Sequence, residues 1–296
     1  MIGFLVVDKE AGWTSHDVVA RCRRILSERR IGHAGTLDPG ATGVLVLGVG
    51  RATRLLSYVS GVDKDYRGEV VLGATTNTLD DEGEVLERFD MAGVTLEEAR
   101  AAAEALTGEV DQIVPMVSAV KVGGQRLHKL ARAGIEVERP VRRVRVERFD
   151  LTEGPEPGTL RLDVRCSSGT YVRVLAADLG TALGGGAHLR RLRRTRVGPF
   201  QESDAKTLEQ IAAAFADGDA SALRPPIDAL GHIEQIRVSD EAGTAVAHGR
   251  PLERASLDAS GAGPYALVDP AGELLAVYEA GPDDDEVRAS VVIRPA

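Results

Sequence analysis

The feature that most constrains the fold of this chain is a glycine-rich stretch that leads directly into an apolar run. The stretch reads GHAGTLDPGATG from Gly32 to Gly43, and the run continues from Val44 to Val49. Its four glycines and one proline predict a backbone that turns tightly and approaches another group closely. A phosphate-binding loop is not predicted, because no Gly-Lys-Ser/Thr follows the stretch and it contains no GxGxxG.

One carboxylate, Asp38, lies at the centre of this stretch. Asp, Pro and Gly together are typical of an ordinary turn, so spacing alone favours a purely structural role for Asp38-Pro39-Gly40. A chemical role for Asp38 therefore depends on what the rest of the chain supplies.

Length and composition indicate one large domain with a sizeable core and a smaller second domain. No apolar run approaches the roughly 18 to 20 residues that a membrane-spanning helix needs. The first residues, MIGFLVV, meet Asp8, Lys9 and Glu10 at once and have no basic leader, which predicts a strand and a cytoplasmic protein. Cys22 and Cys166 form no CxxC pair, so no zinc site and no disulfide are predicted, and both thiols are expected in the core.

Charge is distributed unevenly along the chain. The net charge of −9 and the pI of about 5.3 by themselves argue against a nucleic-acid partner. However, residues 201 to 296 hold 7 Lys and Arg against 18 Asp and Glu, a net of −11, which leaves 29 against 27, a net of +2, for residues 1 to 200. The basic residues of that first part are clustered, so we expect an anionic polymer as partner. The clusters are Arg21, Arg23, Arg24, Arg29 and Arg30; Lys121, Arg126, Lys129 and Arg132; Arg139, Arg142, Arg143, Arg145 and Arg148; and Arg190, Arg191, Arg193, Arg194 and Arg196.

Hydrophobic periodicity predicts alternating strands and helices in the larger domain. Strands are predicted at residues 3–7, 44–49, 64–73, 117–122 and 160–166, and helices beginning near Thr14 or Ser15, at Thr95, at Gln125 and near Thr170. This order indicates an α+β domain with a mixed sheet. Arg173 falls in the first turn of the last helix, where a cation opposes the macrodipole and usually has a reason such as a nearby carboxylate.

The chain divides at Leu223-Arg224-Pro225-Pro226. We assign residues 1–225 to the α+β domain and residues 229–296 to a small β-rich domain, because short β-like runs separated by Gly, Pro and Asp follow the division. Residues 123–150 are predicted to form an RNA-facing insertion, since their short helix is basic and has few apolar residues.

Beyond these patterns, the motifs of residues 3 to about 200 resemble those of the TruB family of pseudouridine synthases. The glycine-rich stretch resembles the family's signature loop, whose usual form has Thr where Ala34 stands. The C-terminal part resembles a PUA-type RNA-binding domain more loosely, by position, β-richness and Gly249-Arg250-Pro251-Leu252. The other motifs, in the family's order, are Val7-Asp8-Lys9 followed by Gly12; Lys64-x-Tyr66; Ser118-Ala119-Val120-Lys121-x-Gly123; Ala131-Arg132-x-Gly134; Gly169-Thr170-Tyr171-x-Arg173 with Asp178-Leu179-Gly180; and Gly186-Ala187-His188 before Leu192-Arg193-Arg194.

The resemblance implies a pseudouridine synthase catalytic domain, followed by a PUA-like domain, that converts uridine 55 in the T-loop of tRNA to pseudouridine. It implies no cofactor and no metal, the T-arm of tRNA as partner, no obligate protein partner, no membrane, and a monomer. The base is detached from its sugar, rotated and rejoined through carbon. Asp38 matches the family's nucleophilic aspartate.

Other roles follow from the resemblance position by position. Arg173 matches the arginine that pairs with the catalytic carboxylate, and Tyr66 matches the aromatic residue that stacks on the target base. The expected substrate-binding residues are Lys9, His33, which would fill the space left by the flipped base, Asp80 at the base edge, Tyr171 as a second aromatic wall, and Leu192 under the base. The expected RNA-binding residues are Lys121, Arg126, Lys129, Arg132, Arg193 and Arg194.

Three other interpretations remain open from the sequence. The chain could be a tRNA-binding and folding protein with secondary catalysis, or belong to the guide-RNA-dependent branch of the same superfamily. It could also be a carboxylate-based hydrolase, which requires Asp80 or Asp178 near Asp38. The synthase interpretation makes one geometric demand: Asp38 and Arg173 must lie within salt-bridge distance in a cleft that Tyr66 borders.

Overall fold

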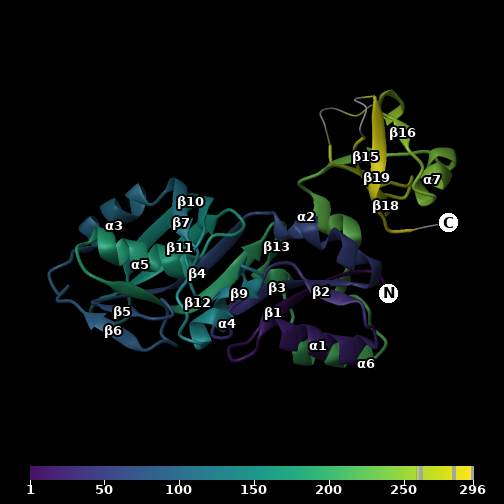
Figure 1. The fold of residues 1–296 in the computed structure, drawn as a ribbon. Coiled ribbons are helices and arrows are strands. Elements are labelled where there is room, and N and C mark those ends of the chain that lie inside the picture. The colour runs from purple at the N-terminus through teal and green to yellow at the C-terminus, as the bar shows by residue number, and fades with distance from the viewer. Residues whose placement is uncertain (258, 260–262, 282–284, 295–296) are drawn as a thin grey trace.

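The computed structural model describes residues 1–257, 259, 263–281 and 285–294, which form a large α+β domain and a small C-terminal β domain (Figure 1). The large domain is built on a ten-stranded sheet in the order β14-β1-β3-β12-β4-β11-β10-β7, with β2 paired to β3 and β13 to β12. Its paired strands are antiparallel except β3 and β12, so the predicted mixed sheet is confirmed. The strands are β1 (Gly3–Lys9), β2 (Ile31–His33), β3 (Thr42–Val49), β4 (Lys64–Leu72), β7 (Gly108–Ile113), β10 (Val141–Glu153), β11 (Thr159–Cys166), β12 (Ala187–Val197), β13 (Phe200–Gln201) and β14 (Leu223–Arg224).

Six helices belong to the large domain, and the predicted N-terminal caps of the first and third are confirmed. Thr14 and Thr95 each form a capping box, with Asp17 and Glu98 respectively. A two-stranded sheet of β5 (Ala74–Thr76) and β6 (Val85–Arg88) projects from the same domain. The helices are α1 (Ser15–Leu26), α2 (Leu56–Ser60), α3 (Leu96–Ala105), α4 (Leu127–Arg132), α5 (Val172–Ala182) and α6 (Leu208–Ala216).

Strand β1 explains how the two domains are joined. Leu5 and Val7 pack into the main core with α1 and α5, whereas Phe4 and Val6 point to a second apolar cluster on the other face of the sheet. That second cluster includes Leu230 and other residues of the C-terminal part. Because both faces of β1 are buried there, residues 3–7 are continuously apolar and do not alternate.

The C-terminal domain contains a five-stranded sheet in the order β15-β17-β18-β19-β16, so the predicted β-rich domain is confirmed. The divide between the two sheets falls between Arg224 and Glu234. One helix, α7 (Asp240–Ala247), was not predicted; Ser239 caps it. The strands are β15 (Glu234–Arg237), β16 (Leu252–Glu253), β17 (Tyr265–Val268), β18 (Leu274–Ala280) and β19 (Glu286–Val292).

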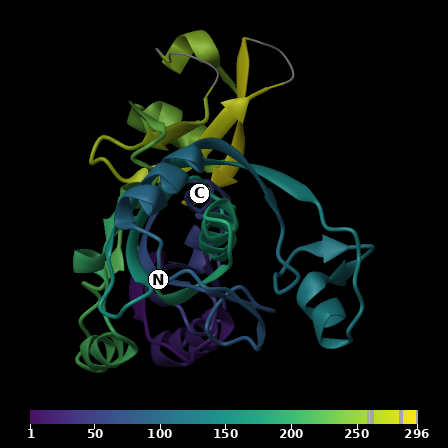
Figure 2. The same cartoon turned by 90° about the vertical axis from the view of Figure 1, so that its left-hand side faces the viewer.

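The predicted insertion begins and ends about ten residues earlier than expected. Residues 141–150 belong to β10 in the central sheet, so the segment outside that sheet runs from Val114 to Pro140. It carries a hairpin of β8 (Lys121–Val122) and β9 (Gln125–Arg126), then α4, and projects away from the sheet in teal in Figure 2. It also has a small core of its own, in which Leu127 and Leu130 are buried. The strand predicted at residues 117–122 is wrong except for its last two residues.

Both cysteines are buried and free, as predicted. No helix within the described ranges is long and apolar enough to cross a membrane.

Candidate active site

The glycine-rich stretch forms the connection between β2 and β3, and Asp38 lies at its middle. Three polar side chains from other elements hold its backbone on both sides of Asp38. The Ser15 hydroxyl donates to Leu37 O at 3.1 Å and accepts from Leu37 N at 2.9 Å. Lys9 Nζ donates to Pro39 O at 3.0 Å, and Arg194 donates to the carbonyls of residues 35, 36 and 44. The loop is therefore a braced scaffold for one carboxylate and not a simple turn.

Two glycines in this stretch are required by close approach. Gly43 has φ of +96°, and a Cβ there would lie 2.2 Å from Arg194 O in the parallel strand β12. Gly35 has φ of +95°, where a side chain would be strained and would extend toward Lys64 and Arg194. These positions explain why the backbone needs glycine, as the sequence predicted.

Asp38 and Arg173 form the predicted ion pair. Arg173 Nε lies 2.9 Å from Asp38 Oδ2. The Arg173 side chain is 5% exposed and the Asp38 side chain 41% exposed. The cation of the pair is therefore buried, and the carboxylate is accessible to solvent. Arg173 also donates to the carbonyls of Thr78 at 2.6 Å and Val117 at 2.9 Å. Each of the three guanidinium nitrogens of Arg173 thus donates a hydrogen bond, which fixes the orientation of the arginine against the carboxylate.

The entry of the chain into α5 is fixed by a buried amide. Gln112 Oε1 accepts from Tyr171 N at 2.9 Å, and its Nε2 donates to Tyr171 O at 3.2 Å. Tyr171 precedes the first residue of α5, so this clamp sets the direction in which Arg173 leaves the helix. The carboxylate that the sequence required for Arg173 is thus supplied from a segment 135 residues away.

A cavity of about 400 Å³ opens over the ion pair. Its walls include Asp38, Arg173, Tyr66, Tyr171 and Leu192, so the three residues predicted to be catalytic and two of those predicted to bind substrate are brought together. Its volume falls in the range of pockets that hold small molecules. Burial raises the pKa of the Tyr66 phenol, which therefore stays protonated at neutral pH.

Asp80 lies at the edge of this cavity and shares its arginine. Asp80 Oδ2 is 3.5 Å from Arg173 Nε, and a smaller recess beside it is lined by Asp38, Asp80 and Leu192. The hydrolase interpretation required a second carboxylate near Asp38, but this one is held by the same cation. Asp178 lines neither space.

Two predicted substrate-binding residues lie outside the cavity lining. Lys9 is fully buried, and its ammonium donates to the carbonyls of Glu10, Trp13 and Pro39. In the structure Lys9 holds the loop, and its predicted contact with substrate stays a prediction. His33 packs edge-on against His16 with ring centroids 5.3 Å apart, and burial lowers its pKa.

The predicted RNA-binding residues divide into two groups. Lys121, Arg126, Lys129 and Arg132 are all exposed on the insertion, and within the described ranges none of them has an ion pair. Arg193 instead donates two bonds of 2.9 Å to Asp8 and a further bond to Glu202. Arg194 is 1% exposed and donates to the backbone carbonyls of Gly35, Thr36 and Val44. Donors of both arginines are used inside the protein, so the arrangement does not favour phosphate binding by these two, which stays a prediction.

Most arginines of the central sheet are also ion-paired within the protein. On the outer face of the sheet these arginines alternate with carboxylates and form ion pairs with them. Solvent partly screens these ion pairs. A long basic run in the sequence therefore does not become a basic surface. The pairs are Arg145 with Asp63; Arg148 with Asp150 and Asp163; Arg165 with Asp65 and Glu147; Arg67 with Asp163 and Glu202; Arg190 with Glu69 and Glu156; Arg191 with Glu69; and Arg196 with Asp65.

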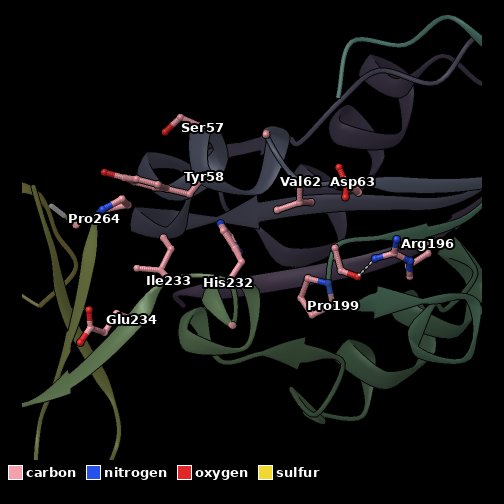
Figure 3. A pocket seen from close by; sticks show the side chains of 14 residues that line it. Ser57, Tyr58, Val62, Asp63, Arg196, Pro199, His232, Ile233, Glu234 and Pro264 are labelled. Atoms are coloured by element: carbon pink, nitrogen blue, oxygen red, sulfur yellow. Dashed lines mark hydrogen bonds between the residues drawn. The ribbon is translucent and has the colours of Figure 1, made fainter. Parts of the chain in front are cut away.

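A larger cavity of about 920 Å³ lies between the two domains (Figure 3). Tyr58 and Val62 line it from the catalytic domain, and His232 and Pro264 from the C-terminal part. Its guanidinium, Arg196, is committed to Asp65 at 2.8 Å and to Gly198 O at 2.9 Å. The ion pair of Asp38 and Arg173 lies in the other cavity, so we place the chemistry there despite the smaller volume.

The fold and the site together place one carboxylate, oriented by a buried arginine, in a pocket of small-molecule size lined by two tyrosines. Among the residues that the structure describes, no group of three or more His, Cys, Asp or Glu side chains is arranged to hold a metal ion. An ionised carboxylate oriented by a buried cation suits covalent catalysis.

Comparison with known proteins identifies the family. The chain belongs to the TruB family of pseudouridylate synthases: the model of the family's N-terminal domain matches residues 23–172. The model described as "tRNA pseudouridylate synthase B C-terminal domain" matches residues 173–232, and "tRNA Pseudouridine synthase II, C terminal" matches residues 234–294. The predicted resemblance and the predicted class of enzyme, an isomerase that makes pseudouridine, are thereby confirmed.

Individual relatives agree along the whole chain. It is 46% identical to the tRNA pseudouridine synthase B of Mycobacterium sp. (strain KMS), over 99% of this chain and 97% of that one. It is 48% identical to the protein of the same name from Rhodococcus jostii (strain RHA1), over 99% and 94%. Among solved structures, it resembles a chain of an H/ACA RNP bound to a substrate RNA containing 2'-deoxyuridine, with a TM-score of 0.77 and 26% identity over 99% of this chain and 85% of that one. A chain of a Cbf5-Nop10-Gar1 complex gives a TM-score of 0.76 and 28% identity, over 99% and 84%.

Proposed function

We propose that this protein converts uridine 55 in the T-loop of tRNA to pseudouridine, acting in the cytoplasm as a monomer without an obligate protein partner. The observation that carries the proposal is the 2.9 Å pair of Asp38 and Arg173 in a cavity bordered by Tyr66. The relatives named tRNA pseudouridine synthase B, at 46% and 48% identity over almost the whole chain, support tRNA as the substrate.

The cavity can receive a uridine only after the base has left its stack. Extrusion of a stacked base costs a few kcal/mol. Stacking on an aromatic side chain returns about 1 to 3 kcal/mol per base, and Tyr66 offers the buried ring for it. Leu192 contacts the base from the other side, and Asp80 accepts from its polar edge. Recognition of the T-loop rests mainly on the shape of the folded loop, which presents an unpaired base that can be turned out into the cavity.

Asp38 then acts as the nucleophile, at C1′ of the ribose or at C6 of the base. In the first route the N1–C1′ bond breaks, its electron pair stays on uracil, and a C1′–O bond forms to Asp38. The base rotates, its C5 attacks C1′, and the Asp38 carboxylate leaves; C5 then loses its proton and N1 gains one. In the second route the addition to C6 also places negative charge on the base. Both routes start from the carboxylate form of Asp38, which Arg173 orients.

Four exposed cations of the insertion bind the phosphates of the T-arm: Lys121, Arg126, Lys129 and Arg132. They lie on the segment that projects from the sheet in Figure 2. Phosphate contacts set affinity and register without reading sequence. The arginines that are ion-paired on the sheet contribute little to this contact.

The test is to incubate the purified chain alone with an unmodified tRNA transcript and to map pseudouridine along it. We expect modification at position 55 only, and none in a matched transcript with cytidine at that position. Absence of pseudouridine unless a guide RNA and protein partners are added would replace the proposal with the guide-dependent function. Improved tRNA folding without any pseudouridine would favour the folding-protein interpretation.

A further inference from the structure

Two buried cations, Lys64 and Arg194, line the catalytic cavity without any carboxylate partner. Lys64 is 5% exposed and Arg194 is 1% exposed. Arg194 donates to backbone carbonyls of the signature loop, and Lys64 Nζ donates to Ser60 O at 3.0 Å and Val62 O at 2.8 Å. Within the described ranges, neither takes part in a salt bridge. An ammonium has three donors, so one donor of Lys64 is left for the cavity.

Such an arrangement is costly for the fold. A buried charge is normally paired with an opposite charge, because desolvation penalises the ionised form. Burial, with a further contribution from Arg194, lowers the pKa of Lys64 to about 8. The central sheet has carboxylates in abundance, yet they lie on its other face. Unpaired charge kept at a cavity wall indicates a site that receives an anion.

The strand register brings both cations next to Tyr66. Arg194 on β12 is the direct partner of Tyr66 on β4. Lys64 lies two residues before Tyr66, so both side chains project from the same face of β4. The two cations also converge on Gly35: a Cβ there would lie 3.5 Å from Lys64 Cε and 3.6 Å from Arg194 Nη1. The glycine leaves the space between them and the cavity open.

We propose that Lys64 and Arg194 form a cation pair that stabilises the negative charge developing on the uracil ring while the base is detached from its sugar. The inference rests on the proposed function. It holds for both routes, because each moves an electron pair onto the ring, which stays negatively charged until C5 forms its bond to C1′. Asp38 and Arg173 act on the sugar or the ring carbon, whereas Lys64 and Arg194 act on the leaving base. Fixed charges in a water-poor site are effective at such a task because they need no reorganisation.

The test compares Lys64→Met and Lys64→Arg with the wild-type chain in single-turnover pseudouridine formation between pH 6.5 and 9.5. At pH 7, we expect Lys64→Met to lower the rate about 100-fold, as loss of one anion-stabilising donor does, with the Kd for tRNA changed less than threefold. Lys64→Arg should keep most of the rate. It should also remove the part of the rate loss above pH 8 that is due to deprotonation of Lys64.

The pH profile separates charge from anchoring. A neutral lysine amine still has two N–H donors for Ser60 and Val62, so a wild-type rate that falls above pH 8 reports lost charge. Arg194 on β12, Cys166 on β11 and Asp63, which is paired with Arg145, face Lys64 and are unchanged in Lys64→Arg. Lys9, whose pKa is also about 8, is unchanged too, so the difference between the two profiles isolates Lys64.

Three results would overturn the inference. One is a Lys64→Met rate within threefold of wild type. Another is a loss of tRNA affinity that accounts for the whole defect. The third is an identical pH profile for wild type and Lys64→Arg, which is decisive even where Lys64→Met does not fold. Failure of the proposed function would be seen separately, as no pseudouridine from the wild-type chain at pH 7.

Discussion

Arg173→Lys is the substitution whose effect follows most directly from the geometry. The guanidinium bridges three segments of the chain, at Asp38, Thr78 and Val117. A lysine ammonium is a compact point charge and cannot reproduce this planar fork. Hydrogen bonds to a charged group contribute roughly 1.5–3 kcal/mol each, and the ammonium can keep one of the three. We therefore expect the free energy of unfolding to fall by about 3–5 kcal/mol, close to the cost of breaking a buried ion pair.

The catalytic effect of this substitution should be separable from the loss of stability. A nucleophile misplaced by about 1 Å loses on the order of 100-fold in rate, or about 2.7 kcal/mol. Single-turnover pseudouridine formation at saturating tRNA measures the rate, and urea denaturation measures stability. Arg193→Lys is the matched control: it also breaks an arginine–carboxylate pair, the bidentate one with Asp8, but outside the cavity, so it should reduce stability and leave the rate unchanged. A rate for Arg173→Lys within threefold of wild type would refute the role assigned to the ion pair.

Three further outcomes follow from the same structure. Ser15→Ala leaves the buried N–H and C=O of Leu37 unpaired and should lower the free energy of unfolding by about 2–4 kcal/mol, with a rate loss of about tenfold. Ser15→Thr keeps the hydroxyl and should recover part of both losses. An unchanged Tm for Ser15→Ala would contradict the role of Ser15 in holding the loop. Lys129→Ala should reduce the slope of log affinity for tRNA against log salt concentration by about 1. Arg193→Ala should leave that slope unchanged, because Arg193 is paired with Asp8 and Glu202. Equal slopes for the two variants would show that these ion pairs do not prevent arginines of the sheet from binding RNA. Burial lowers the pKa of Lys9 from 10.5 to about 8. Between pH 8 and pH 10.5 the unfolded chain therefore binds more protons than the folded chain, and the free energy of unfolding should rise with pH. Lys9→Met should show a shallower rise, and the same dependence on pH in variant and wild type would contradict the burial of a charged lysine.

The parts of the fold set by local patterns could be predicted from sequence. The caps at Thr14 and Thr95 and the strand from Lys64 depend on residues close in the chain. Strand β10 was missed for a physical reason. Its Val144 and Val146 alternate with arginines, which is the pattern of a half-buried strand. The same basic run is also typical of a segment that binds RNA, so the sequence alone did not separate the two. Each of those arginines is placed on the outer face of the sheet by that alternation.

The electrostatics of the chain could not be predicted, because partners in ion pairs are far apart in sequence. Arg193 and Asp8 are 185 positions apart and meet only because β1, β3 and β12 are neighbours in the sheet. The burial of Lys9 and Arg194 depends in the same way on the path of the loop. By contrast, the ion pair between Asp38 and Arg173 was predictable. An arginine at a helix N-terminus usually has a nearby carboxylate, and the family resemblance of the glycine-rich stretch indicated Asp38 as that carboxylate. Lys64 could have been found from its position two residues before Tyr66 on one strand face.

The central claim is that Asp38 is the nucleophile of a base-detaching reaction. The most direct measurement is the single-turnover rate of pseudouridine formation by Asp38→Asn at saturating tRNA, together with its Kd for tRNA. Asn keeps the shape of the side chain and removes the charge, so we predict a rate lowered by at least about 1000-fold with a Kd within a few-fold of wild type. A variant that binds tRNA normally and still forms pseudouridine at more than a tenth of the wild-type rate would contradict the account.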